Sequence, residues 1–243
     1  GKDHVVVRCE VDDPVLPQIR MAADSFEFIK VHHVPIDEGN FTIEVISGER
    51  NASFTYEGEF DEERLTEFVT MKTFPLFNQV NVPLLRRSEP LKVYSLWYFY
   101  KAPINTTHES LFKKMAIEFE GKVIFFSFNK VISEDQVRSF HHNATVYPVI
   151  SVIHENKRNI FAMPEETEIT EASVRAFLDE VMTGKAKPNL RVGRKLKPEE
   201  QKDVWRINGE EFDEFVHAKG KDSMIIFCVT RADVCKYFLE GAL

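Results

Sequence analysis

The feature that most constrains the fold is an internal repeat, in which the same order of strands and helices occurs twice. Two predicted helices show it best, one beginning after Asp61 and one spanning Thr170–Thr183, because their apolar residues recur 109 positions apart. The matched pairs are Leu65 with Val174, Phe68 with Phe177, and Val69 with Leu178. Residues spaced i, i+3 and i+4 share one helix face, so each helix is expected to close its unit by covering a sheet.

Apolar and β-branched runs predict the strands of each unit. In the first unit these are Val5–Val11, Phe26–Val34 and a hairpin of Phe41–Ile46 with Ala52–Tyr56. In the second they are Leu91–Tyr100, Val123–Phe128, Tyr147–Ile153 and Asn159–Met163. Further helices are predicted after Asp12 or Asp13, over Thr107–Glu120 and over Glu134–His142. Each unit therefore follows the order β-α-β-α-β-β-α, with gaps in the first.

A polar, basic stretch containing Pro188 and Pro198 predicts a linker after the second unit. A strand at Val204–Ile207, a helix at Glu210–Ala218 and a strand at Ser223–Val229 then predict the beginning of a third unit. About 40 residues are too few to bury a sheet on both faces, so the third unit is expected to be truncated. The predicted limits are 1–72 and 73–184 for the two domains, 185–203 for the linker and 204–243 for the third domain.

Composition and charge exclude several classes of function. Lys and Arg total 31 against 39 Asp and Glu, and a net charge of −8 disfavours nucleic acid or an anionic membrane as partner. No apolar run approaches the roughly 20 residues of a membrane helix, so no membrane span is expected. The sequence starts at Gly1 without a charged-then-apolar leader, so any targeting peptide is expected to be absent or already removed. No cofactor and no metal are expected. The pairs His32-His33 and His141-His142 place adjacent side chains on different faces, where they cannot act together as ligands.

Asparagine usage points to a compartment. Four of the eleven Asn residues lie in Asn-x-Ser/Thr sequons, whereas the 24 Ser and Thr residues predict about one by chance. The four candidate glycosylation sites are Asn40, Asn51, Asn105 and Asn143. Such an excess is typical of a glycoprotein of the secretory pathway with exposed loops at these positions, and coincidence is the alternative.

The order of elements is that of a thioredoxin-like domain, and four segments resemble the protein disulfide isomerase family. They are Tyr56–Phe60 running on to Phe74-Pro75-Leu76, Phe119–Phe126, Gly184–Leu190 and Val204–Val216. In order, they are similar to the end of the family's b domain, a helix-to-strand segment of b′, the linker after b′ and the opening of the catalytic a′ domain. The resemblance implies an α/β fold of tandem thioredoxin-like domains, the first lacking its opening strand and the helix before Phe41. It also implies residence in the endoplasmic reticulum lumen.

The family performs redox chemistry with Cys-x-x-Cys at a helix N-terminus, where the helix dipole stabilises the attacking thiolate. Aligned on Cys235-Lys236, this chain has Ala232 at the nucleophile position. The flanking Trp and Pro are replaced by Arg231 and Thr230, and the buried acidic residue by Ile226. The motif is therefore degenerate, and we expect no dithiol oxidase or isomerase activity. Cys235 is expected to be an inert thiol, with residual mixed-disulfide formation as the alternative.

The resemblance implies a second site, an apolar substrate pocket between the first and third helices of b′. By alignment its walls fall near Val80, Leu84, Leu85, Val137 and Phe140. An exposed apolar groove binds unfolded segments with little sequence preference, because burial is non-directional. The competing prediction is that these residues are core. The same resemblance predicts a cis peptide bond at Tyr147-Pro148.

The sequence thus predicts a redox-inactive chaperone of this family that binds unfolded or partially folded secretory proteins, with other chaperones as further candidate partners. One alternative is an active protein disulfide isomerase whose Cys-x-x-Cys lies outside this sequence. A second is an acidic, calcium-buffering thioredoxin-fold protein, suggested by the acidic cluster at Glu57–Glu63. Helix capping and complementation of the helix dipole are the preferred explanation of that cluster, and a net charge of −8 is too modest to favour calcium buffering.

Overall fold

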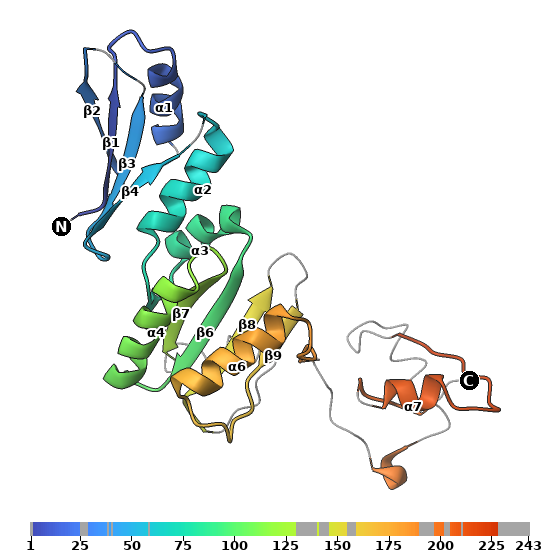
Figure 1. Cartoon of the computed structure of the whole chain (residues 1–243). Helices are drawn as coiled ribbons and strands as arrows, with labels where there is room; N and C mark the ends of the chain where they lie inside the picture. The colour runs from blue at the N-terminus through green and yellow to red at the C-terminus, as the bar shows by residue number, and fades with distance from the viewer. Residues whose placement is uncertain are drawn as a thin grey trace. The chain divides into compact units, whose positions relative to one another are not determined.

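The computed structural model describes residues 2–24, 29–37, 39, 41–57, 59–129, 140, 146–154, 159–189, 197–201, 205–209 and 211–227. The chain divides into two compact parts, Gly1–Pro188 and Asn189–Leu243. The first part contains two α/β domains, each built on one sheet (Figure 1). Within the described ranges, no helix combines the length and the apolar character needed to cross a membrane.

The first domain is a four-stranded sheet with both of its helices on one face (Figure 1). Its elements are β1 (His4–Cys9), α1 (Val15–Asp24), β2 (Lys30–Pro35), β3 (Thr42–Ser47), β4 (Ala52–Tyr56) and α2 (Glu62–Thr73). The strand order is β2-β1-β3-β4, with β2 parallel to β1. This confirms the predicted hairpin and the Asp61 cap, whose Oδ1 accepts a hydrogen bond from Arg64 N at 2.7 Å.

Packing in the first domain follows the alternation of its strands. Val5 and Val7 point to the helices and are buried with Leu65 and Val69 of α2. The opposite face carries polar pairs such as Arg8 with Glu44, joined at 2.8 Å. Between β2 and β3, the described residues 36, 37, 39 and 41 form no helix.

The second domain has a five-stranded sheet in the order β5-β7-β6-β8-β9. Its elements are β5 (Asn78–Gln79), α3 (Val82–Ser88), a 3₁₀ turn (Glu89–Leu91), β6 (Tyr94–Tyr100), α4 (Thr106–Glu118), β7 (Val123–Asn129), β8 (Val149–His154), β9 (Asn159–Ala162) and α6 (Glu171–Met182). β5 and α3 were not predicted, and Leu91 lies in the 3₁₀ turn rather than in the predicted strand. Of the predicted helix Glu134–His142, the described residues include only Phe140, which lies in a turn.

This second sheet has a core on each face. Leu96 and Tyr98 of β6 belong to the cluster that α4 and α6 cover. Trp97 belongs, with Phe99, to the cluster on the α3 face. Strands buried on both faces are continuously apolar, which explains the aromatic run Tyr94–Tyr100.

Two X-Pro peptide bonds in the described ranges are cis. Tyr147–Pro148, immediately before β8, is one of them and agrees with the prediction. Ala102–Pro103, between β6 and α4, is the other and was not predicted.

The second compact part retains only short elements. A 3₁₀ turn occupies Pro198–Glu200, and α7 (Phe212–Val216) lies inside the predicted helix Glu210–Ala218. The predicted strands Val204–Ile207 and Ser223–Val229 are wrong where the structure describes them, since Trp205–Ile207 and Ser223–Phe227 form no strand. A strand needs a neighbour for its backbone hydrogen bonds, and Met224 and Phe227 remain 91% and 84% exposed.

Candidate functional site

Helix α3 determines which apolar residues of the second domain are accessible. It begins after Asn81, whose Oδ1 accepts a hydrogen bond from Leu84 N at 2.9 Å, and Pro83 lies in its first turn. With this start, Leu84 points inward and is only 7% exposed, whereas Val82 is 61% exposed. Val82 and Leu85 are three positions apart and therefore lie on the same side of the helix.

The structure brings four of the five predicted pocket residues to the same core cluster. Leu84 is part of that cluster, so the competing core prediction describes it correctly. Val80, Leu85 and Phe140 are half-buried and pack against the cluster from outside. Val137 lies outside the described residues.

Phe140 rests on an aromatic platform formed by β6. Its ring centroid is 4.5 Å from that of Trp97 and 5.0 Å from that of Phe99. Together with Val80, Val82 and Leu85 it forms what we call the α3 surface. Val82 was missed by sequence reasoning, although Asn81 followed by Pro83 is a helix-start signal that could have revealed it.

A second region of interest is the loop between β6 and α4, which starts beside the cis-proline Pro148. Phe99 pairs with Val149, the residue after Pro148, so the loop that follows β6 starts next to that proline. This loop, residues 101–105, contains no cysteine. The loop that starts beside Pro148 and the helix α4 that follows it therefore supply no thiolate, a point that was not predicted from the sequence.

The cysteines of the chain form no Cys-x-x-Cys pair. Cys9 is fully buried in the first core, as expected of a small apolar residue. The degenerate motif of Ala232 and Cys235 lies outside the described residues, and so does Cys228.

A polar pair, formed by buried Tyr98 and half-buried His108, lies at the first turn of α4. Tyr98 is 1% exposed, and its hydroxyl lies 2.9 Å from His108 Nδ1. Burial raises the pKa of Tyr98 to about 12 and lowers the pKa of His108. Both shifts favour the neutral forms near pH 7, so the contact between the two side chains is a hydrogen bond between neutral groups.

The described part of the chain has no group of three or more His, Cys, Asp or Glu placed to hold a metal ion. His33 lies 3.2 Å from Cys9 O through its Nε2, whereas neighbouring His32 is exposed. In the acidic cluster, Asp61 caps α2, as predicted, and Glu63 pairs with Lys92 at 3.6 Å.

Two of the four sequons lie in described, exposed positions. Asn51 is in the β3–β4 turn, and Asn105 is the N-cap of α4. Asn105 Oδ1 accepts hydrogen bonds from Thr107 N at 2.9 Å and from His108 N at 3.3 Å. A glycan is attached through the amide nitrogen, so capping by the oxygen and glycosylation are compatible. Asn40 and Asn143 lie outside the described residues.

We expect Thr107→Ala and Asn105→Ala to separate these two roles of Asn105. When the chain is expressed through a secretory pathway, both changes should remove one glycan, detected by mass spectrometry before and after enzymatic deglycosylation. In deglycosylated protein, only Asn105→Ala should lower the free energy of unfolding, by about 0.5–2 kcal/mol, because only it removes the cap. An unchanged mass in both variants, or equal stability of the two, would contradict the prediction.

Fold and site together describe a tandem thioredoxin-fold protein without cysteine at its described helix N-termini. Residues 27–180, more than half of the chain, match the thioredoxin-like domain family. The protein disulfide isomerase of Oryctolagus cuniculus is 22% identical over 95% of this chain and 45% of its own length. That of Gallus gallus is 22% identical over 74% of this chain and 36% of its own.

Two solved structures share the fold. The bb fragment of ERp72 aligns with a TM-score of 0.54 and 16% identity, over 77% of this chain and 92% of that one. The zinc-bound form of human ERp44 aligns with a TM-score of 0.51 and 14% identity, over 82% and 63%. The chain therefore belongs to the thioredoxin-like domain family, and it is similar to curated protein disulfide isomerases. It spans less than half of the curated relatives it matches.

Proposed function

We propose that this chain assists protein folding in the endoplasmic reticulum lumen by binding apolar segments of unfolded or partially folded secretory proteins, without redox chemistry of its own. The observation that carries the proposal is the α3 surface, where half-buried and exposed apolar side chains lie over an aromatic core. Grouped exposed apolar residues are typical of sites that bind other proteins.

Two further observations support this proposal. The loop that starts beside the cis-proline Pro148 has no cysteine, and the sequence contains no Cys-x-x-Cys, so we infer binding rather than redox chemistry for these domains. The exposed sequons at Asn51 and Asn105 support a luminal location. The alternative is an active isomerase. The chain covers only 45% of the length of the protein disulfide-isomerase of Oryctolagus cuniculus, and in this alternative the Cys-x-x-Cys lies outside the given sequence.

The proposal is tested by titrating a fluorescent apolar peptide and measuring its anisotropy. Val82→Asp should weaken binding about tenfold, because it places a charge where apolar contact is needed. Phe140→Ala should also weaken binding, and its melting temperature should stay close to that of the original protein. If Phe140→Ala instead costs roughly 3–5 kcal/mol of stability, Phe140 is core and not part of the site.

The matched control is Ile117→Asp. Ile117 lies on α4, which covers the opposite face of the sheet, and is 58% exposed against 61% for Val82. The Ile117→Asp variant should bind the peptide with the same affinity as the original protein. The proposal fails if the original protein binds no apolar peptide, or if Ile117→Asp weakens binding as much as Val82→Asp.

A further inference from the structure

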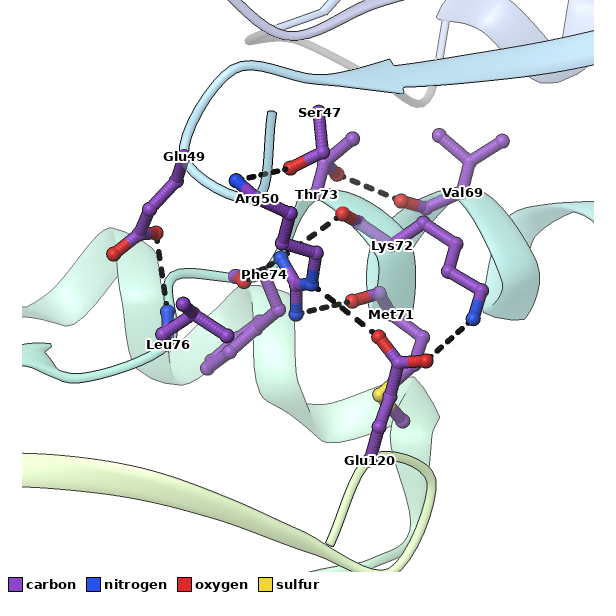
Figure 2. Close-up of polar contacts among 10 residues, drawn as sticks. All are labelled: Ser47, Glu49, Arg50, Val69, Met71, Lys72, Thr73, Phe74, Leu76 and Glu120. Carbon is purple, nitrogen blue, oxygen red and sulfur yellow. Dashed lines mark hydrogen bonds and ion pairs between the residues drawn. The ribbon is translucent and has the colours of Figure 1, made fainter. Parts of the chain in front are cut away.

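The turn between β3 and β4, residues 48–51, contacts the segment that joins the two domains of the first compact part (Figure 2). The first domain holds this turn in place. Asp3 Oδ1 accepts a hydrogen bond from Gly48 N at 2.7 Å, and Ser47 Oγ accepts one from Arg50 N at 3.4 Å. Asn51 completes the turn with a φ of 49°, in the left-handed region that Asn adopts more readily than most residues.

Arg50 donates to three backbone carbonyls at the end of α2. Its guanidinium bonds Phe74 O at 2.9 Å, Lys72 O at 3.0 Å and Met71 O at 3.4 Å. The last carbonyls of a helix have no partner within the helix and carry the negative end of its dipole, so a cation with several donors stabilises them. The Arg50 side chain is only 8% exposed, which protects these bonds from water.

Glu49 extends the contact along the chain. Its Oε2 accepts a hydrogen bond from Leu76 N at 3.1 Å, two residues beyond the last carbonyl that Arg50 reaches. Two consecutive turn residues therefore hold both ends of residues 71–76, which we call the connector.

The second domain contributes the counter-charge. Glu120, in the turn after α4, places Oε1 3.3 Å from Arg50 Nε and pairs through Oε2 with Lys72 (Figure 2). Its side chain is 23% exposed. A partly buried arginine needs such a partner, because an unpaired charge with little access to water is costly.

The other side of the connector is anchored in the second core. Phe74 is 2% exposed and belongs to the cluster on the α3 face. Arg87 of α3 lies over the Phe74 ring, 5.8 Å from its centroid, and donates to Thr73 Oγ1. The connector is thus bound by the β3–β4 turn of one domain and by the core, Arg87 and Glu120 of the other.

We infer that the β3–β4 turn is an interdomain clamp, in which Arg50 and Glu49 of the first domain lock the connector onto the second domain. With the clamp closed, the two domains unfold as one cooperative unit and do not move as independent bodies. Arg50 and Glu49 are positioning residues in this arrangement. The inference does not depend on peptide binding at the α3 surface.

The test compares the full chain with Arg50→Met, which keeps the aliphatic stem and removes the guanidinium. Scanning calorimetry should give one transition for the two domains of the original protein and two resolved transitions for the variant. Hydrogen–deuterium exchange should show the Leu76 amide exchanging about tenfold faster in the variant, because local opening no longer breaks the clamp contacts.

Arg8→Met is the matched control. Arg8 also pairs with a carboxylate on the first sheet, that of Glu44, but it is far from the connector in sequence and its partner lies outside the connector. This variant should keep a single transition, and its Leu76 amide should exchange as slowly as in the original protein. Glu120→Gln removes the counter-charge from the second domain and leaves the first domain unchanged. It should also give two transitions and faster Leu76 exchange, and it replaces Arg50→Met as the test if Arg50→Met does not fold. Two transitions in the original protein would overturn the inference. It would also be overturned if Glu120→Gln and a folded Arg50→Met both kept one transition and an unchanged exchange rate at Leu76.

Discussion

Phe126→Ala should destabilise the second domain by about 3–5 kcal/mol, the usual cost of removing a fully buried phenyl ring. Phe126 is 0% exposed at the centre of β7 and contacts the rings of Phe74, at 5.9 Å, and of Trp97, at 5.0 Å, measured between centroids. These aromatic neighbours come from the connector and from β6, so removal of the ring leaves a cavity between them. Urea denaturation followed by circular dichroism measures the change in unfolding free energy.

Phe126→Leu is the matched variant. It keeps most of the apolar volume and should cost less than about 1.5 kcal/mol. If Phe126→Ala is no more costly than Phe126→Leu, then the cluster on the α3 face does not carry the stability that its burial indicates.

The second large effect is an absence of catalysis. In insulin reduction and in refolding of a scrambled disulfide protein, the chain should give no turnover above that of Cys235→Ala. Dithiol exchange needs a nucleophile and a resolving thiol close together, and Ala232 removes the nucleophile. Cys9 cannot replace it, because its thiol is fully buried in the first core.

Two controls make this result interpretable. Cys228→Ala tests whether the other cysteine near the motif acts as a partner for Cys235, and it too should match the background rate. Ala232→Cys restores the Cys-x-x-Cys spacing and is the variant in which turnover could appear. Turnover by the original chain that disappears in Cys235→Ala would refute the prediction of redox inactivity.

Local signals predicted the parts of the fold that depend on local sequence. In the hairpin at Phe41–Tyr56, apolar and polar residues alternate on both sides of a Ser-Gly turn. For the helix after Asp61, both the capping residue and the spacing of the apolar residues can be recognised in the sequence. The same holds for the helix that Thr170 caps, where Ser173 N bonds Thr170 Oγ1 at 3.2 Å. In each case the residues that decide the structure are within a few positions of one another.

Elements that depend on distant partners were harder to predict. β5 has two residues and no pattern, and it exists because it pairs with Phe126 and Ser127 of β7. The strand predicted at Ser223–Val229 has the right composition, but its described residues lack a neighbouring strand. Sequence reports how well a segment suits a sheet, whereas the sheet itself decides whether the segment joins it.

The candidate site shows the same limit on a smaller scale. Leu84 and Leu85 are adjacent and chemically identical, so no pattern distinguishes the core residue from the half-buried one. The distinction comes from the position at which Asn81 starts α3. The clamp was also beyond sequence reasoning, because Arg50, Lys72 and Glu120 are far apart along the chain and meet only in the folded protein.

The placement of the two tryptophans has a spectroscopic consequence. Trp97 is 6% exposed and touches Phe140 of the α3 surface, whereas Trp205, in the other compact part, is 58% exposed. A buried indole emits at shorter wavelength and is shielded from iodide, while an exposed indole emits further to the red and is quenched. The intrinsic emission of the chain thus separates into two signals, and the iodide-resistant one comes from the indole directly beneath the surface that a bound peptide would cover.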